Sequence, residues 1–135
     1  MAISQSLRNR AVVVERYVTL PATSATTVGP AVPAGTLVLA AGIQVLQAVP
    51  DITTYTANVT DGTTTFASAV VLDAAPANTI RIGTTAGLVA TADTIDAVTT
   101  ISGSPGTIRA RIFAVIIDVT PSVFRAEEVD RDVLA

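Results

Sequence analysis

The strongest β-strand pattern in the chain runs over Thr107–Val119. In its first half apolar residues alternate with two arginines, which is the two-residue period of a strand with one buried and one solvated face. From Phe113 on the alternation ends, because Phe113, Val115 and Ile117 continue the side that the arginines held. A strand that is apolar on both sides is covered on both sides, by other elements or by another subunit. The pattern therefore predicts a strand in the interior of its sheet, with these three residues as candidate subunit or capsid contacts.

Shorter segments with the same alternation predict the rest of a β-rich chain. They are Ala11–Leu20, Thr36–Ala40, Ile43–Val49, Tyr55–Thr60, Thr65–Leu72, Thr79–Gly83 and Asp93–Ile101. Gly42 is expected to end one strand before the next begins, and Asp61-Gly62 is the strongest hairpin signal in the chain. The turn at 102–106 is expected to join Asp93–Ile101 to the strand at Thr107–Val119 in one long antiparallel hairpin.

These elements predict an all-β fold, an antiparallel β-sandwich or jelly roll of about eight to nine strands. No segment before residue 121 has a 3.6-residue apolar period, which argues against an α/β fold. We expect three parts: an N-terminal arm over 1–10, a sandwich domain over 11–120 and a C-terminal tail over 121–135. A chain of 135 residues is long enough for one such domain with its own core.

Composition changes this picture mainly at the surface. Half of the residues are hydrophobic but only 4% are aromatic and 14% are charged, with a net charge of −3. So few charges suggest that partners cover part of the surface, although a Thr-rich surface would explain the shortage equally well. The basic residues are dispersed arginines, so no nucleic-acid partner is expected, and the apolar runs are too short for a membrane span.

Candidate chemistry is sparse. The absence of Cys and His removes thiol nucleophiles, imidazole bases and the usual zinc ligands. Carboxylates remain, but Asp93 and Asp96 are three residues apart and would lie on opposite faces of a strand. A calcium site using Asp61 or Asp93 stays open, without the dense Asp/Asn spacing that would make it specific. We therefore expect no enzyme, no catalytic residue, no metal and no cofactor.

The two ends of the chain hold the remaining candidate contacts. The N-terminal arm is either a frayed terminus or a segment that becomes ordered on a partner, and the tail is either solvated or packed on a neighbouring subunit. We favour the packed tail, because a solvated tail has no need of apolar anchors. The candidate subunit or capsid contacts in these segments are Arg8, Arg10, Phe124, Glu127, Glu128, Val133 and Leu134.

The order of turns and strands resembles a known family. The matching segments are Val-Pro-Ala-Gly-Thr at 32–36, Ile43–Val49, Ala57–Gly62 with Phe66, Thr91–Ala97 and Arg109–Val119. Together they are similar to the small auxiliary capsid proteins of tailed bacteriophages, which are called decoration, cement or head-stabilising proteins. The resemblance covers about residues 32–119 and consists of turns and strands, which phage fibre and knob domains also use.

The resemblance implies a function without catalysis. Members of this family bind the outside of a mature head, often as trimers or dimers, and reinforce the joints between capsomers. The expected partners are the major capsid protein and further copies of this chain, in a homotrimer first and a homodimer next. The expected location is the virion surface, with the host cytoplasm during assembly. The alternative is a head-fibre or adhesin domain that binds host glycans through Thr-rich loops such as 22–30 and 51–54.

Overall fold

The computed structural model describes residues 10–119 of the chain, and these residues form an all-β fold without a helix. The predicted all-β class is confirmed. The strands of the described part are β1 (Val12–Leu20), β2 (Thr26–Thr27), β3 (Ala31–Val32), β4 (Thr36–Val45), β5 (Thr54–Thr60), β6 (Thr65–Val71), β7 (Ile80–Ile82), β8 (Gly87–Val89), β9 (Asp93–Thr94), β10 (Asp96–Ser102) and β11 (Ile108–Asp118).

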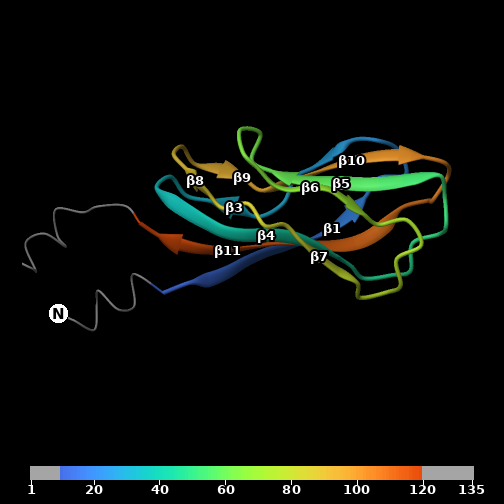
Figure 1. Cartoon of the computed structure of the whole chain (residues 1–135), viewed down its shortest axis with the longest axis horizontal. Coiled ribbons are helices and arrows are strands. Elements are labelled where there is room, and N and C mark those ends of the chain that lie inside the picture. Colours follow the sequence, from blue (N-terminus) through green and yellow to red (C-terminus); the bar gives the residue numbers. More distant parts are fainter. Residues whose placement is uncertain (1–9, 120–135) are drawn as a thin grey trace, which may run out of the picture.

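The strands form antiparallel sheets in two layers (Figure 1). One layer is a five-stranded sheet with the order β1-β11-β4-β7, in which β8 pairs with the first part of β4. The other is a four-stranded sheet with the order β2-β10-β5-β6, and β3 pairs with β9 in a small separate ribbon. The arrangement is sandwich-like, because each large sheet turns one face toward the other and one face outward.

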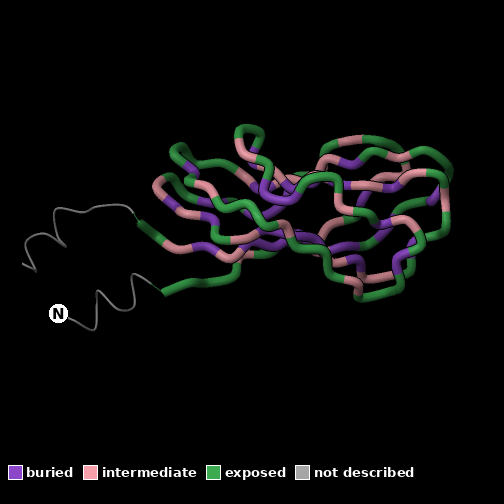
Figure 2. Tube along the Cα trace, viewed as in Figure 1, coloured by how far each residue is buried: buried purple, intermediate pink, exposed green. Residues whose placement is uncertain are grey.

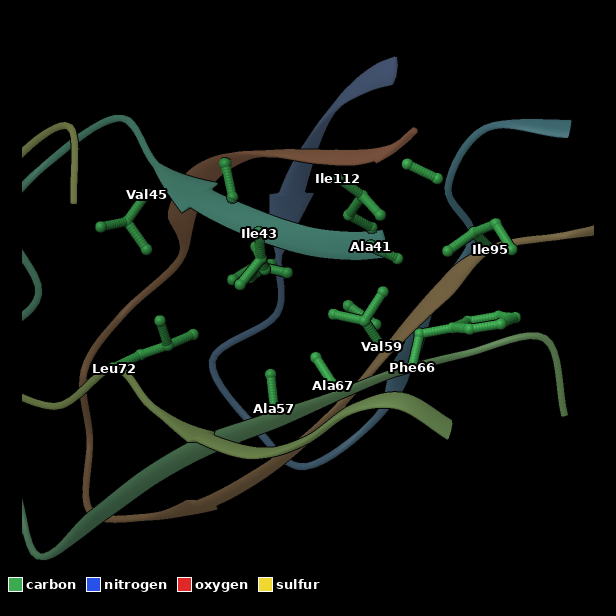
Figure 3. Packing of buried hydrophobic residues seen from close by; sticks show 14 of the residues in the cluster. Ala41, Ile43, Val45, Ala57, Val59, Phe66, Ala67, Leu72, Ile95 and Ile112 are labelled. Carbon is green, nitrogen blue, oxygen red and sulfur yellow. The ribbon is translucent and has the colours of Figure 1, made fainter. Parts of the chain in front are cut away.

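The hydrophobic core lies between the two layers. Ile43 of β4 and Ile112 of β11 point toward Val59 of β5 and Phe66 of β6, with Ile95 at one end of the cluster (Figure 3). All five side chains are buried. Burying a side chain of this size stabilises a fold by about 1.5–3 kcal/mol relative to leaving it in water. Figure 2 shows the buried stretches concentrated where the layers face each other, whereas the start of β1 is exposed.

The strand at Thr107–Val119 is central, as predicted. It becomes β11, the longest strand of the described chain. It pairs with β1 over Ile108–Ile116 on one side and with β4 over Ala110–Asp118 on the other. Its alternation also holds: Ile108, Ala110 and Ile112 face the core, and the two arginines face outward.

The predicted hairpin between Asp93–Ile101 and Thr107–Val119 is wrong. β10 pairs with β5 and β2 in the four-stranded sheet, while β11 lies in the five-stranded sheet. The connection over 103–107 therefore passes from one layer to the other. Each strand has one apolar face, and the two faces cover the same core from opposite sides. Alternation predicts which face is buried, but it does not say which strand lies alongside.

Two local predictions also fail. Gly42 does not end a strand, because β4 runs unbroken from Thr36 to Val45. In β6 we expected simple alternation from Phe66, but Phe66 and Ala67 are both buried and Ser68 is exposed. The register with β5 shifts at this point, and Ala69 has a positive φ of 47°. A bulge of this kind turns two neighbouring side chains to the same face.

Both ends of the described chain lie at the same end of the sandwich (Figure 1). Val12 of β1 pairs with Ile116 of β11. Asp118 and Thr36 form the last pair between β11 and β4. The segments 1–9 and 120–135 lie outside the described residues, so the predicted arm and tail stay predictions. The two described residues next to these segments, Arg10 and Val119, adjoin the neighbouring strands β1 and β11.

Candidate functional site

The outward side of the five-stranded sheet, here called the outer face, brings together side chains from five strands. Directly paired residues of antiparallel strands point to the same face, so the register gives its composition row by row. Val13 of β1, Val115 of β11 and Ala40 of β4 form one row, and Ile117, Leu37 and Leu88 form the row beyond it. The outer face is therefore apolar at the end where β1 starts and β11 finishes.

The middle of the outer face is built around Phe113. Its ring lies against Gly42 of β4, where an added Cβ would be 2.9 Å from the Cζ atom of the ring. Ile82 of β7 pairs with Gly42 and continues this row to the edge of the sheet. The Phe113 side chain is only 6% exposed. Its own chain covers it, so it orders the outer face and offers little surface to a partner.

The other end of the outer face carries the charged and amide side chains, in a row that also contains the exposed Tyr17 and Ile80. Arg111 forms an ion pair with Glu15 of β1, and its Nε donates a hydrogen bond of 3.0 Å to Oε1 of Gln44 on β4. Its guanidinium also lies 4.7 Å from the centroid of the Phe113 ring, within cation–π distance. Arg111 thus ties three strands together. Arg109 donates to the neutral side chain of Gln47, and among the described residues no carboxylate pairs with it.

The exposed members of the outer face lie on its flanks. Val13 is 58% exposed, Ile82 is 56% exposed and Leu88 is 54% exposed. Val115 and Ile117 are half-buried between these flanking strands. Scattered apolar residues are ordinary at a protein surface, but a continuous patch of them usually marks an interaction site. The apolar part of the outer face is such a patch, and it contains two of the predicted contact residues.

The structure places the remaining predicted contacts as follows. Arg10 is exposed immediately before β1. Arg8, Phe124, Glu127, Glu128, Val133 and Leu134 lie outside the described residues. Sequence reasoning missed Val13, Leu37 and Leu88 as members of the same surface, because their strands meet β11 only through long-range pairing.

Two carboxylates of the described chain, Asp61 and Asp96, each accept two hydrogen bonds. Asp61 Oδ1 accepts hydrogen bonds from the backbone N–H groups of Thr63 at 2.8 Å and Thr64 at 2.6 Å. Asp96 Oδ1 accepts from the Thr94 hydroxyl at 2.7 Å and from the backbone N–H of Gly29 at 3.3 Å. Asp61 thus braces its own turn, whereas Asp96 holds the Thr94 hydroxyl and the backbone of the distant Gly29.

Asp61 and Asp93, the two residues considered for calcium, line one hollow of about 140 Å³. Asp93 Oδ1 accepts the backbone N–H of Thr94. Within residues 10–119 there is no group of three or more His, Cys, Asp or Glu side chains that could hold a metal ion. Two carboxylates beside a hollow are too few ligands to specify calcium.

A second surface feature is a shallow groove of about 560 Å³ between the edges of the two sheets. Arg16, Tyr17 and Thr19 of β1 line one side of it, and Thr26 and Thr27 of β2 line the other. Tyr17 is 65% exposed. An exposed aromatic ring beside hydroxyl groups and a guanidinium can stack on a flat apolar surface and form hydrogen bonds with its polar substituents.

Comparison with known proteins does not assign the chain to a family. No protein-family model matches the chain, and no curated protein is significantly similar to it. Over the described residues no helix is long and apolar enough to cross a membrane. The feature of the described chain that bears most directly on function is the apolar part of the outer face.

Proposed function

We propose that this protein is a structural virion protein, which binds the outer surface of a tailed-phage capsid as a homo-oligomer and stabilises contacts between capsomers. The observation that carries the proposal is the apolar part of the outer face, which a chain with few charges leaves exposed at one end of a braced sheet. The resemblance of the turns and strands to auxiliary capsid proteins gives the class of partner.

The geometry suits such a role. A cement protein needs a stiff body with interfaces to its neighbours, and the clamp formed by Arg111, Glu15 and Gln44 stiffens the outer face across three strands. A homotrimer is the first choice of assembly and a homodimer the second, since closed symmetry gives every copy the same set of contacts. Several weak contacts with the shell then add up through avidity.

The test combines capsid binding with a matched pair of variants. Purified protein is mixed with expanded heads that lack it, and the heat resistance of the heads is measured. The wild type should bind and raise resistance. Val13→Glu puts a charge into the apolar patch, and Thr100→Glu puts the same charge at an exposed position of β10 in the other sheet.

Val13→Glu should lower both native mass and head stabilisation, and Thr100→Glu should change neither. Failure of the wild type to bind heads or change their resistance would overturn the assignment to a capsid. Equal effects of the two variants would show that the outer face is not the surface used in assembly.

The groove beside Tyr17 supports a second candidate function, a glycan-binding domain of a head fibre or adhesin. Thr26 and Thr27 belong to the Thr-rich loop region that sequence reasoning connected with sugars, and Tyr17 supplies a ring for stacking. A glycan array probed with the isolated protein tests this reading. Specific binding that Tyr17→Ala abolishes would favour it, and an array without any specific signal would exclude it for the glycans present.

A further inference from the structure

We propose that residues 120–135 of one copy lie along the outer face of a neighbouring copy, running antiparallel to β11. This inference rests on the proposed function and identifies what occupies the surface used in assembly. The segment would place its apolar residues on the apolar part of the outer face and its acidic residues near Arg109.

The first argument is the order of side chains on the outer face. Reading β11 backward from its end, the outward residues are Ile117, Val115 and Phe113, followed by Arg111 and Arg109. Arg111 is already paired with a carboxylate of its own chain, whereas Arg109 contacts only a neutral amide among the side chains of the described part. The surface thus changes from apolar to cationic in one direction.

Up to Asp132 the C-terminal segment has the matching order. Val123 and Phe124 come first, Glu127, Glu128, Asp130 and Asp132 follow, and Val133 and Leu134 come after them. Two arginines are interleaved, so the segment has an acidic excess. A segment that ran backward along β11 would place apolar residues on Ile117 and Val115 first and carboxylates close to Arg109 afterwards. Opposite charges then meet at one end only, which selects one direction.

The second argument is where the segment starts. It leaves β11 after Val119, at the apolar end of the outer face. It cannot pair directly beside β11 in its own sheet, because β1 and β4 occupy both sides of that strand. Thr120 precedes Pro121, and a residue before proline favours extended backbone.

Length allows the segment to reach a neighbour. Residues 122–135 span up to roughly 46 Å when extended, and β11 has 11 residues, about 36 Å at the rise of a strand. The exit point and the apolar part of the outer face lie at the same end of the molecule (Figure 1). Copies grouped around a symmetry axis at that end would each offer a segment to the next copy.

Disulfide trapping in the full chain tests the proposal, because the natural sequence has no cysteine that could interfere. Two singly substituted proteins of different tag size are mixed and oxidised mildly, and covalent heterodimers are measured on a denaturing gel. Phe124→Cys should cross-link with Val115→Cys. Asp130→Cys should cross-link with Thr19→Cys, which lies beside Arg109 on β1 and leaves the charge of Arg109 in place. The control Thr100→Cys lies in the other sheet and should give several-fold less product with either tail variant.

Each other outcome overturns the proposal. A disulfide formed only within a chain carrying both Phe124→Cys and Val115→Cys would place the segment on its own sandwich. Efficient pairing of two Val115→Cys chains would show that two outer faces meet directly. Cross-linking of the swapped pairs, Phe124 with the Arg109 end and Asp130 with Val115, would show that the segment does not run in the stated direction. No product above the control would show that the segment does not dock on the outer face. Circular dichroism of each variant checks the fold, and Ile117→Cys replaces Val115→Cys if the latter unfolds.

Failure of this inference differs from failure of the proposed function. If the wild-type protein is oligomeric and protects heads but no cross-link forms at the predicted pairs, the proposed function stands and the docking of residues 120–135 on a neighbouring copy is wrong. Wild-type protein that is monomeric and does not bind heads removes the function, whatever the cross-linking shows.

Discussion

The guanidinium of Arg111 lies 4.7 Å from the centroid of the Phe113 ring, two residues further along the same strand. The same guanidinium bonds Glu15 on one neighbouring strand and Gln44 on the other. This contact marks the point where the outer face changes from polar to apolar. It also explains how an aromatic residue on the outside of a sheet becomes buried.

Removing the Arg111 side chain should destabilise the fold moderately. Arg111→Ala loses a cation–π contact and a partly exposed ion pair, so the free energy of unfolding should fall by about 1–2 kcal/mol. Urea denaturation at low and high salt measures the loss. Arg109→Ala, whose side chain contacts only Gln47, is the control and should lose less. Equal losses would mean that the clamp does not stabilise the sheet.

Gly42 should tolerate no larger residue. An added Cβ would lie 2.3 Å from the backbone oxygen of Arg81, a distance that real side chains do not reach. Gly42→Ala should therefore push β7 from its place and lower stability by about 1–3 kcal/mol, as other overpacked substitutions do. Thermal unfolding measures the effect. At Gly62 an added Cβ meets nothing within 4 Å but φ is +92°, so Gly62→Ala should be affected less, through backbone strain alone. A wild-type melting temperature for Gly42→Ala would contradict the close packing.

Tyr55→Phe should stabilise the protein. The Tyr55 side chain is fully buried, and its hydroxyl has no hydrogen-bond partner among residues 10–119. A buried hydroxyl without a partner costs about 1–3 kcal/mol, and phenylalanine keeps the ring without that cost. We expect the free energy of unfolding to rise by about 1 kcal/mol at neutral pH. The exposed Tyr17→Phe is the control and should change little. A loss of stability in Tyr55→Phe would show that the hydroxyl is bonded, for example by a buried water.

The same residue predicts a loss of stability at high pH. Burial raises the pKa of the Tyr55 phenol from 10.0 to about 12. Below pH 10 the phenol is protonated in both states, so its contribution is fully present. Between pH 10 and 12 the unfolded state ionises first, and stability falls by at most about 1.4 kcal/mol per pH unit. Denaturant titrations at pH 8, 10 and 11 should show this fall in the wild type and a smaller one in Tyr55→Phe.

Asp61 should matter for the hairpin between β5 and β6. Its Oδ1 atom accepts the N–H groups of Thr63 at 2.8 Å and Thr64 at 2.6 Å. Asp61→Ala should lose about 1–2 kcal/mol, because it leaves turn N–H groups without an acceptor. Asp61→Asn keeps an acceptor oxygen of the same shape and should recover most of the loss. Similar losses in both variants would show that the charge, rather than the acceptor, is needed.

Local patterns predicted much of this fold for an identifiable reason. The faces of β1, β5 and β11 follow from alternation alone, and the Asp61-Gly62 turn follows from two residues whose conformation suits a hairpin. Gly42 misled the prediction, because a glycine that admits a neighbouring backbone looks the same in sequence as one that ends a strand. The bulge at Ala69 carries no sequence signal at all.

The candidate site depended on both levels. The sequence of Thr107–Val119 alone shows that the outward side of this strand changes from polar to apolar at Phe113. Alternation, however, is a property of one strand, and a surface is made by several. Only the pairing of β11 with β1 and β4, rather than with β10, brought Val13, Leu37 and Leu88 beside Val115 and Ile117. The sequence thus determined the two faces of β1, β5 and β11, and the long-range pairing decided which faces form one surface.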